Sequence, residues 1–136
     1  MSAETNKAIV RRLWEEVWNQ RNLNVCDEIF DADYAAHEKG FAPVLRAAFP
    51  DLHFTIEDMI AEDDKVVTRH TLTGTHQGEF MGIAATGKPV KVTGIWIHRL
   101  SNGRIVEGRE WGEWDALGMM KQLGQYEPRI GNNNRR

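Results

Sequence analysis

The sequence predicts an α+β fold in which N-terminal helices pack against one face of a curved antiparallel sheet. Three observations support this prediction. Apolar residues recur at helical spacing in roughly the first third of the chain, and they alternate with polar residues from Asp51 onward. Finally, the segment 101–103 (Ser-Asn-Gly) separates two of the alternating segments and is a strong hairpin signal.

The N-terminal part predicts three helices. In residues 5–20, two rows of apolar side chains with a spacing of four form one broad buried stripe, made of Ile9, Leu13 and Val17 beside Val10, Trp14 and Trp18. Thr5 is a suitable N-cap for this helix, and residues 19–22 favour its end. Segments 22–30 and 41–49 predict two shorter helices, the latter ending before a proline.

The rest of the chain predicts two hairpins and a last helix. The four expected strands are 52–60, 65–76, 90–100 and 104–111. The first pair is joined by the acidic turn 61–64 and the second by 101–103, while the glycine-rich segment 78–89 between the hairpins predicts a loop. Segment 115–124 predicts a helix that begins at an aspartate N-cap and stops at Gly124.

Length and composition limit the domain organisation and the classes of partner. With 136 residues, the chain is expected to form a single domain, 1–136, with a flexible tail over about 127–136. A net charge of -3 gives no basic surface for nucleic acid, and no apolar run is long enough to span a membrane. One cysteine cannot form an intramolecular disulfide, and the polar N-terminus lacks the features of a signal peptide, so we expect a cytoplasmic protein.

Several segments, in this order, carry a resemblance to a known family: "NKAIVRRLWEEVWNQRNLNVCDEIFDADYAAH", "LRAAFPDLHFTIEDMIAEDDKVV", "TGTHQGEFMGIAATGKPVKVTGI" and "DALGMMKQLG". They resemble the SnoaL-like polyketide cyclases, or ester cyclases, of the nuclear-transport-factor-like superfamily. The resemblance implies a conical fold, with a long helix across a strongly bent sheet and a pocket between them. It also implies a homodimer or a higher homo-oligomer that assembles through the sheet.

The same resemblance implies an activity. Characterised cyclases of the family close a polyketide ring by intramolecular aldol condensation without a metal or a cofactor, and many other members have no assigned reaction. The chain departs from its relatives in three places. Only "EKG" separates His37 from Phe41, which leaves one wall of the pocket open or narrows the pocket; Ala84 and Ala85 replace a Pro-Pro pair; and the link to the last helix is about two residues longer.

The register of the second hairpin decides which carboxylate faces the pocket. A two-residue turn would pair Leu100 with Ile105 and place Glu110 with Ile95 and Ile97. A three-residue loop with a glycine bulge would instead pair Leu100 with Arg104. We favour the second register because it groups small, aromatic and polar side chains on one face: Gly94, Trp96, His98, Val106, Gly108 and Glu110. The opposite face would then suit a dimer interface and hold Ile95, Ile97, Arg99, Ile105, Glu107 and Arg109.

This register makes Glu110 the candidate acid. Counting along the strand from "NGRI", the catalytic acid of the family also falls on Glu110, whereas counting back from the last helix places it nearer Trp111 to Glu113; Asp115 remains a third candidate. A buried, protonated carboxyl can supply the proton that an aldol closure needs, and His98 and His37 would assist. The alternative is that Glu110 pairs with an arginine and only anchors the strand.

An apolar pocket is expected around these groups. Trp14, Trp18 and Trp96 would line it, although aromatic residues at helical spacing are more often core residues. His70 shares a strand face with other inward candidates, and two glycines would leave room for a ligand, namely Gly94 and Gly108. The expected lining is completed by two residues of the glycine-rich loop, Phe80 and Met81.

Three functions remain as hypotheses. The first is a cofactor-free enzyme that closes a ring in a hydrophobic carbonyl compound, and the second is a binding module that holds a small hydrophobic molecule unchanged. The third is water addition, as in epoxide hydrolases of this fold, for which Arg69 is the arginine to test. Metal binding is not expected, because no histidine pair has helical spacing and there is no Cys/His cluster. With serines only at Ser2 and Ser101, a serine hydrolase is not expected either.

Overall fold

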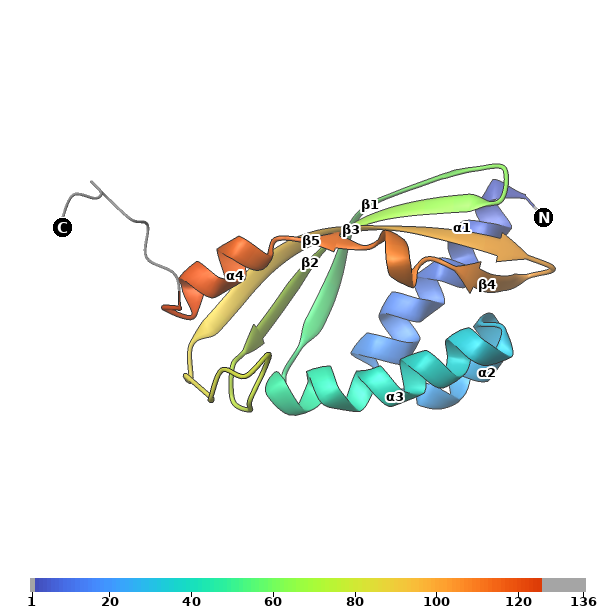
Figure 1. The fold of residues 1–136 in the computed structure, drawn as a ribbon. Helices are drawn as coiled ribbons and strands as arrows, with labels where there is room; N and C mark the ends of the chain where they lie inside the picture. The colour runs from blue at the N-terminus through green and yellow to red at the C-terminus, as the bar shows by residue number, and fades with distance from the viewer. Residues whose placement is uncertain (1, 126–136) are drawn as a thin grey trace.

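The computed structural model describes residues 2–125, and it has the α+β architecture that the sequence predicts (Figure 1). The helical segments are α1 (Ala3–Arg12), the π-helix η1 (Leu13–Asn19), the 3-10 turn η2 (Leu23–Val25), α2 (Cys26–Ile29), α3 (Ala32–Ala48), the 3-10 turn η3 (Arg109–Trp111) and α4 (Ala116–Gln122). The strands are β1 (His53–Glu62), β2 (Lys65–Thr75), β3 (Pro89–Ser101), β4 (Arg104–Glu107) and β5 (Glu113–Trp114). The expected tail, 127–136, lies outside the described residues.

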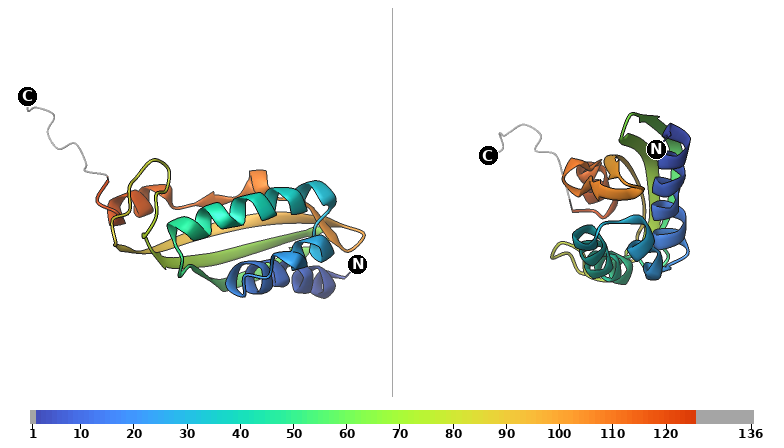
Figure 2. Two further views of the ribbon diagram at one scale, coloured as in Figure 1. Left: turned by 90° about the horizontal axis from the view of Figure 1, so that it is seen from below. Right: turned by 90° about the vertical axis from the view of Figure 1, so that its right-hand side faces the viewer.

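The strands form one antiparallel sheet in the order β1-β2-β3-β4, and β5 also pairs with β3. The sheet is curved and does not close (Figure 1), and a bulge in β1 between Ile56 and Asp58 adds to its bend. Helices α1, η1 and α3 lie on the same side of the sheet (Figure 2). This arrangement is the expected cone. No helix in residues 2–125 combines the length and the apolar character needed to cross a membrane.

The first helical segment buries the predicted apolar stripe. Five of its six members are less than 5% exposed: Val10, Leu13, Trp14, Val17 and Trp18. The predicted N-cap is wrong, because the side chain of Ser2 accepts the hydrogen bond from the Thr5 N–H and the helix begins at Ala3. The change from α to π geometry occurs at Leu13, just before Trp14 and Trp18, whose rings both contact that of Phe54 in β1. Such π segments are frequent at functional sites.

Helix α3 is longer than the sequence predicts. It begins at Ala32 rather than at about residue 41, and the side chain of Asp31 caps it by accepting a hydrogen bond from the Tyr34 N–H. Gly40 and Pro43 both disfavour a helix interior, which hid the continuous helix from sequence analysis. The short segment after His37 is therefore a turn of helix and not a loop.

The favoured register of the β3–β4 hairpin is wrong. Asn102 and Gly103 both have positive φ, 53° and 77°, and form a two-residue turn whose twist matches that of the strands. Leu100 consequently pairs with Ile105, and Val106 bulges out so that Arg99 pairs with Glu107. The two-residue turn also places Ile105 opposite the buried Leu100, so its side chain lies in the core, where it was expected on the outer face.

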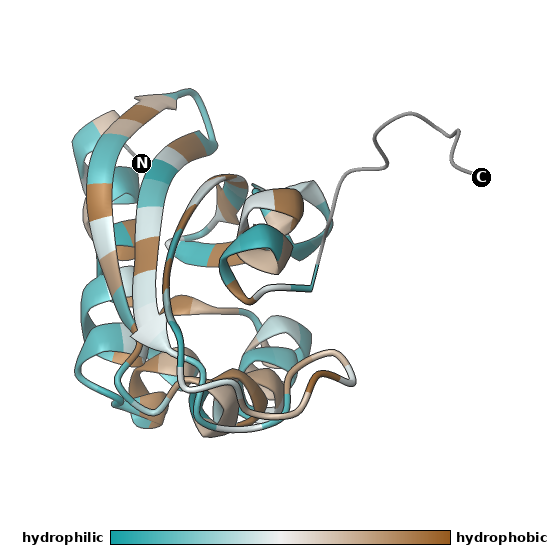
Figure 3. Cartoon of the chain, turned by 90° about the vertical axis from the view of Figure 1, so that its left-hand side faces the viewer, coloured by the Kyte–Doolittle hydropathy of each residue, from teal (hydrophilic) through white to brown (hydrophobic). Residues whose placement is uncertain are grey.

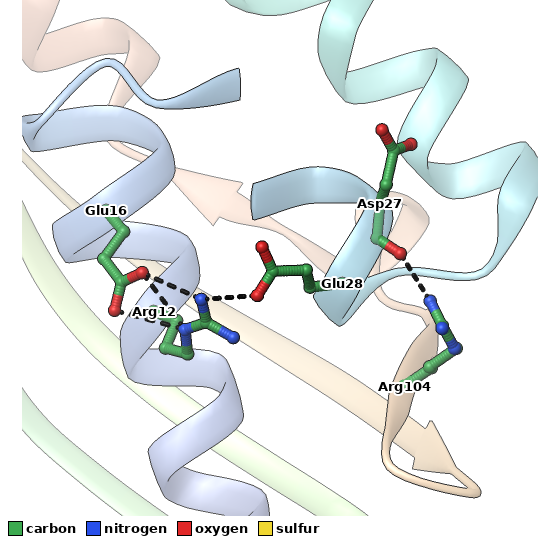
Figure 4. A network of polar contacts seen from close by, with 5 residues as sticks. All are labelled: Arg12, Glu16, Asp27, Glu28 and Arg104. Atoms are coloured by element: carbon green, nitrogen blue, oxygen red, sulfur yellow. Dashed lines mark hydrogen bonds and ion pairs between the residues drawn. The ribbon is translucent and has the colours of Figure 1, made fainter. Parts of the chain in front are cut away.

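A polar network joins α1, α2 and β4 (Figure 4). The Arg12 guanidinium forms ion pairs with Glu16, one turn further along the same helical segment, and with Glu28 of α2. Arg104 of β4 donates a hydrogen bond of 2.6 Å to the backbone carbonyl of Asp27. The network holds the short α2 between the first helix and the second hairpin.

The two faces of the sheet differ in burial, and apolar and polar residues alternate along its strands (Figure 3). On the concave face, the side chains of Val66, His70 and Val92 are buried against the helices. On the opposite face, Ile60 is 61% exposed and Ile95 is 46% exposed. The apolar core and the site described below therefore lie on the concave side.

Candidate functional site

A cavity of about 320 Å³ lies between the concave face of the sheet and the helices. This volume is at the lower end of the range for small-molecule sites. Most of its lining is apolar or aromatic, and it consists of Leu13, Trp14, Trp18, Tyr34, His37, Glu38, Phe41, Leu45, Phe54, His70, Leu72, Phe80, Val92, Trp96, His98, Arg109, Trp114 and Met119.

Trp14 stands at the centre of an aromatic cluster on one side of the cavity. Its ring centroid lies 4.7 Å from that of His70, 5.0 Å from Phe54 and 6.1 Å from His98. The ring of Trp96 is stacked nearly parallel to that of His98, with an angle of 11° between the planes. Trp14 belongs to the buried core and also lines the cavity, and its Nε1 has no hydrogen-bond partner within residues 2–125.

Helix α3 forms the facing wall. Its side chains that line the cavity lie three, four, seven and eleven residues after Tyr34 and so share one face of the helix: Tyr34, His37, Glu38, Phe41 and Leu45. This wall contains a carboxyl group that the sequence analysis missed. The missed signal was the helical spacing itself, which becomes visible only when the helix is extended back to Ala32.

Glu38 is the carboxylic acid that lines the cavity. The residue is only 8% exposed, and its Oε2 accepts one hydrogen bond, from Trp18 Nε1 at 3.2 Å. Burial raises the pKa of Glu38 to about 7, while the hydrogen bond from Trp18 and the charge of Arg109 oppose this shift. A carboxyl with this pKa can both accept and release a proton near neutral pH.

Two buried histidines face Glu38 across the cavity from the sheet. Burial lowers the pKa of His70 and that of His98 to about 4, so both rings are neutral at neutral pH. Neither ring nitrogen of His70 has a hydrogen-bond partner within residues 2–125, and the same is true of His98 Nδ1. A neutral imidazole offers one N–H donor and one acceptor, so these rings can bind a carbonyl or hydroxyl group.

The glycines next to His70 and His98 were expected to leave room for a ligand, but they have a different role. A Cβ added to Gly94 would lie 2.8 Å from His70, and one added to Gly108 would lie 2.4 Å from His98. These two glycines make room for the imidazoles rather than for a ligand, and neither lines the cavity. A third glycine acts in the same way, because a Cβ on Gly112 would lie 2.3 Å from the Trp96 ring.

The structure places Glu110 outside the cavity. It lies in η3, is exposed, and its carboxylate accepts a hydrogen bond from the Gly108 N–H at 3.3 Å. Hydrogen bonds with the backbone lower the pKa of Glu110, contrary to the burial on which its predicted role depends. The shifted register and the η3 turn bring Trp114, in place of Glu110, opposite Gly94.

The two other candidate acids do not line the cavity either. Glu113 is exposed beside β3, and Asp115 caps α4 by accepting a hydrogen bond from the Gly118 N–H. Of the loop residues, Phe80 lines the cavity whereas Met81 is 66% exposed and does not. His37 lines the cavity although it is exposed, which places it at the mouth.

The expected aromatic lining is present in full: Trp14, Trp18 and Trp96 all border the cavity, together with His70 and His98. Tyr34, Glu38 and Trp114 also line the cavity and were not predicted from the sequence, and Arg109 lines it although it was expected on the outer face. Within residues 2–125, no three Cys, His, Asp or Glu side chains come together in an arrangement that could hold a metal ion.

With this geometry established, comparison with known proteins shows the family. The model of the family described as SnoaL-like polyketide cyclase matches residues 8–123. The chain belongs to the SnoaL-like polyketide cyclase family. Among curated protein sequences, none matches this SnoaL-like chain significantly.

Solved structures agree with the family and with the fold. A candidate SnoaL-like polyketide cyclase from Jannaschia sp. CCS1 is 27% identical, with a TM-score of 0.78 over 93% of this chain and 95% of that one. AclR, a candidate hydroxylase from Streptomyces galilaeus, is 28% identical, with a TM-score of 0.77 over 93% of this chain and 89% of that one. IdmH, a candidate polyketide cyclase from Streptomyces antibioticus, is 29% identical, with a TM-score of 0.75 over 88% and 98% of the two chains.

Proposed function

We propose that this SnoaL-like protein is a cofactor-independent enzyme that closes a ring in a hydrophobic carbonyl compound by general acid/base chemistry, with Glu38 as the acid/base. The observation that carries the proposal is a single buried carboxyl, with a pKa of about 7, in the wall of a largely apolar cavity. Membership of the polyketide cyclase family supports the reaction type.

The proton moves from carbon to oxygen by way of Glu38. The Glu38 carboxylate takes a proton from the carbon next to a carbonyl group, which leaves an enolate. The enolate carbon then attacks a second carbonyl of the same molecule, forming the C–C bond of the ring and placing the negative charge on the second oxygen. The protonated Glu38 returns its proton to that oxygen, so the product is an isomer of the substrate and the enzyme is regenerated.

The neutral histidines suit the stabilisation of the enolate. A buried N–H donor that is already in position can stabilise the charge that develops on the carbonyl oxygen, and a neutral imidazole is able to do this. His98 is buried among Trp14, Tyr34 and Trp96, so its ring is held in place before a substrate arrives. We assign His98 the stabilising role and His70 the orientation of the substrate.

Exchange of hydrogen for deuterium tests the first step without knowledge of the substrate. The probe is 1-tetralone in D2O, and the measurement is the loss of the proton signal next to its carbonyl by NMR. The wild-type protein should accelerate this exchange, and Glu38→Gln should lower the acceleration by at least about a hundredfold, because general-base catalysis contributes on this scale.

The matched control is Glu110→Gln. Glu110 is exposed and outside the cavity, so this variant should exchange like the wild type. Loss of exchange in Glu110→Gln with retention in Glu38→Gln would instead return the catalytic role to the residue that the hairpin pattern first suggested.

A binding module is the second candidate function. The apolar lining and the unpartnered polar atoms of Trp14, His70 and His98 also suit a small molecule that is held without reaction. It would be supported if 1-tetralone bound to the wild-type protein without any exchange. Water addition of the epoxide-hydrolase type has less support, because Arg69 is exposed and is not among the lining residues.

A further inference from the structure

Arg109 lies at the mouth of the cavity and is part of its lining. The residue is exposed, and its guanidinium carbon lies 5.6 Å from the centre of the Tyr34 ring. This stacking holds a planar cation in one orientation without using its N–H donors. The mouth thus presents a preoriented guanidinium to any molecule that enters.

The N–H donors of Arg109 have no acceptor among the described residues. Within residues 2–125, Arg109 makes neither a hydrogen bond nor an ion pair, whereas Arg12 and Arg99 are both paired with carboxylates. Arg69 is likewise unpaired in this part of the chain, but it is on the opposite face of the sheet from the cavity. Among the residues that the structure describes, Arg109 alone places an unpaired guanidinium in the lining of the cavity.

A role in neutralising the charge of Glu38 does not explain why Arg109 lies at the cavity. The two side chains form no ion pair, and the charge of Arg109 lowers the pKa of Glu38 less than the hydrogen bond from Trp18 does. Burial prevails over both effects, so Glu38 remains largely protonated just below neutral pH. Arg109 is the permanent cation of the lining. Its charge also helps to lower the pKa of the neighbouring exposed Glu110, but within residues 2–125 the two side chains form no ion pair, so the N–H donors of Arg109 remain available for a ligand.

We propose that Arg109 binds a carboxylate of the substrate, so that the substrate is an amphipathic organic acid whose apolar rings enter the cavity while its carboxylate stays at the mouth. The planar guanidinium can donate two parallel hydrogen bonds to a carboxylate, which is the strongest pairing available to it. The inference deepens the proposed function, since it assigns a substrate class to the same cavity.

The arrangement also fixes the direction in which the molecule enters. With its carboxylate at Arg109, the apolar body must point toward the aromatic cluster around Trp14, and a carbonyl on that body would approach His98. One charged end outside and a reactive carbonyl inside would give the substrate a single orientation.

Binding of a matched pair of probes tests the proposal. The probes are 2-naphthoate and its neutral counterpart 2-naphthamide, titrated into the full-length protein by calorimetry at about pH 6. At this pH a carboxylate of ordinary pKa is ionised, whereas Glu38 is mostly protonated and does not repel it. The wild-type protein should bind the anion roughly ten- to a hundredfold more tightly than the amide, as expected for hydrogen bonds to a charged group.

Variants show whether the preference comes from Arg109. Arg109→Gln should abolish the preference and leave the affinity for the amide unchanged, while Arg109→Lys should keep only part of it because an ammonium cannot form the parallel pair. The control Arg69→Gln should bind both probes like the wild type. Equal or absent binding of the anion in the wild type, or a full preference in Arg109→Gln, would overturn the proposal.

The same titrations separate this inference from the catalytic role of Glu38. Glu38→Gln should keep the preference for 2-naphthoate even when it no longer catalyses deuterium exchange. A Glu38→Gln variant that keeps full exchange would refute the proposed mechanism but not the anion site. Loss of the preference for 2-naphthoate in Arg109→Gln, with binding of 2-naphthamide retained, would support the anion site whatever the rate of exchange in that variant.

Discussion

The buried environment of Glu38 disfavours the ionised form of its side chain. A carboxylate that loses its hydration needs several hydrogen bonds in compensation, and Glu38 receives one, from Trp18. The protein therefore holds the group in its neutral form over a pH range in which an exposed glutamate would be ionised. This destabilising feature is typical of functional sites, where pKa values are shifted toward the pH at which the chemistry occurs.

The stability of Glu38→Gln should depend on pH in a defined direction. The pKa of Glu38 rises from 4.5 in the unfolded chain to about 7 in the folded protein, so between these values the folded state binds more protons and loses stability as the pH rises. In Glu38→Gln, this loss of stability with rising pH is absent because glutamine does not ionise. The unfolding free energy of the variant relative to the wild type should rise by about 3 kcal/mol between about pH 4.5 and about pH 8.

Chemical denaturation at several pH values measures this difference. The two buried histidines titrate in both proteins and cancel in the comparison. Glu110→Gln should show no such rise, because the pKa of Glu110 is lowered and not raised. A difference that stays constant with pH would mean that Glu38 is ionised in the folded protein throughout.

Glycines in the segment from β4 to β5 determine the positions of the rings that border the cavity. Gly112→Ala would place a methyl group within 2.4 Å of three atoms of the Trp96 ring, so the ring must move. We expect a loss of about 1–3 kcal/mol in stability, as for other overpacked sites. Affinity for 2-naphthamide should fall by about tenfold, because the displaced indole borders the cavity.

Gly40→Ala is the matched control for this substitution. It adds the same methyl group within α3, where nothing lies within 4 Å of the new atom. Alanine is also the better helix former, so this variant should gain about 0.5–1 kcal/mol and bind the probe normally. Similar losses in both variants would show that the Trp96 contact does not determine the effect.

The elements with regular patterns were predictable, and those that depend on tertiary packing were not. Strands β1 to β3 follow the alternation of apolar residues, and the cavity side chains of the sheet, Trp96, His70 and His98, follow from it. Local propensity started the predicted third helix about nine residues too late, because the cost of Gly40 within α3 is offset by packing of the whole helix. Glu38 lies in the part of α3 that was not predicted, so its place in the cavity wall could not be predicted either.

Glu110 was predicted to face the cavity for a different reason, which is the register of the second hairpin. The favoured register and the observed one differ by one residue at the turn, and both are compatible with a Ser-Asn-Gly sequence. The bulge at Val106 shifts the pairing again, and nothing in the local pattern of "RIVEG" reveals it. Side chains beyond such a bulge can be assigned to a face only from the structure.

At the scale of the whole molecule, the outer face of the sheet is suited to self-association. Ile60, Val67 and Ile97 lie side by side on three neighbouring strands, and Ile95 is exposed near them. Exposed apolar residues that gather on one face are typical of protein interfaces. We therefore expect a homodimer that forms through this face and leaves both cavities open.

Substitution by a charged residue tests the dimer. The double variant Ile60→Glu and Ile95→Glu should be a monomer by light scattering coupled to gel filtration, and it should still bind 2-naphthamide because the cavity is on the other face. Val44→Glu is the control, since Val44 is 58% exposed on α3, away from the sheet, and should leave the oligomer intact. A wild-type protein that is monomeric at all concentrations would contradict the expectation.

The one-residue bulge at Val106 has an evolutionary consequence. The gain or loss of a single amino acid at this bulge would exchange the inward and outward positions of the residues that directly follow it, beginning with Glu107, which now pairs with Arg99. Such a change would turn a different side chain toward the cavity while α3, which carries Glu38, stayed in place.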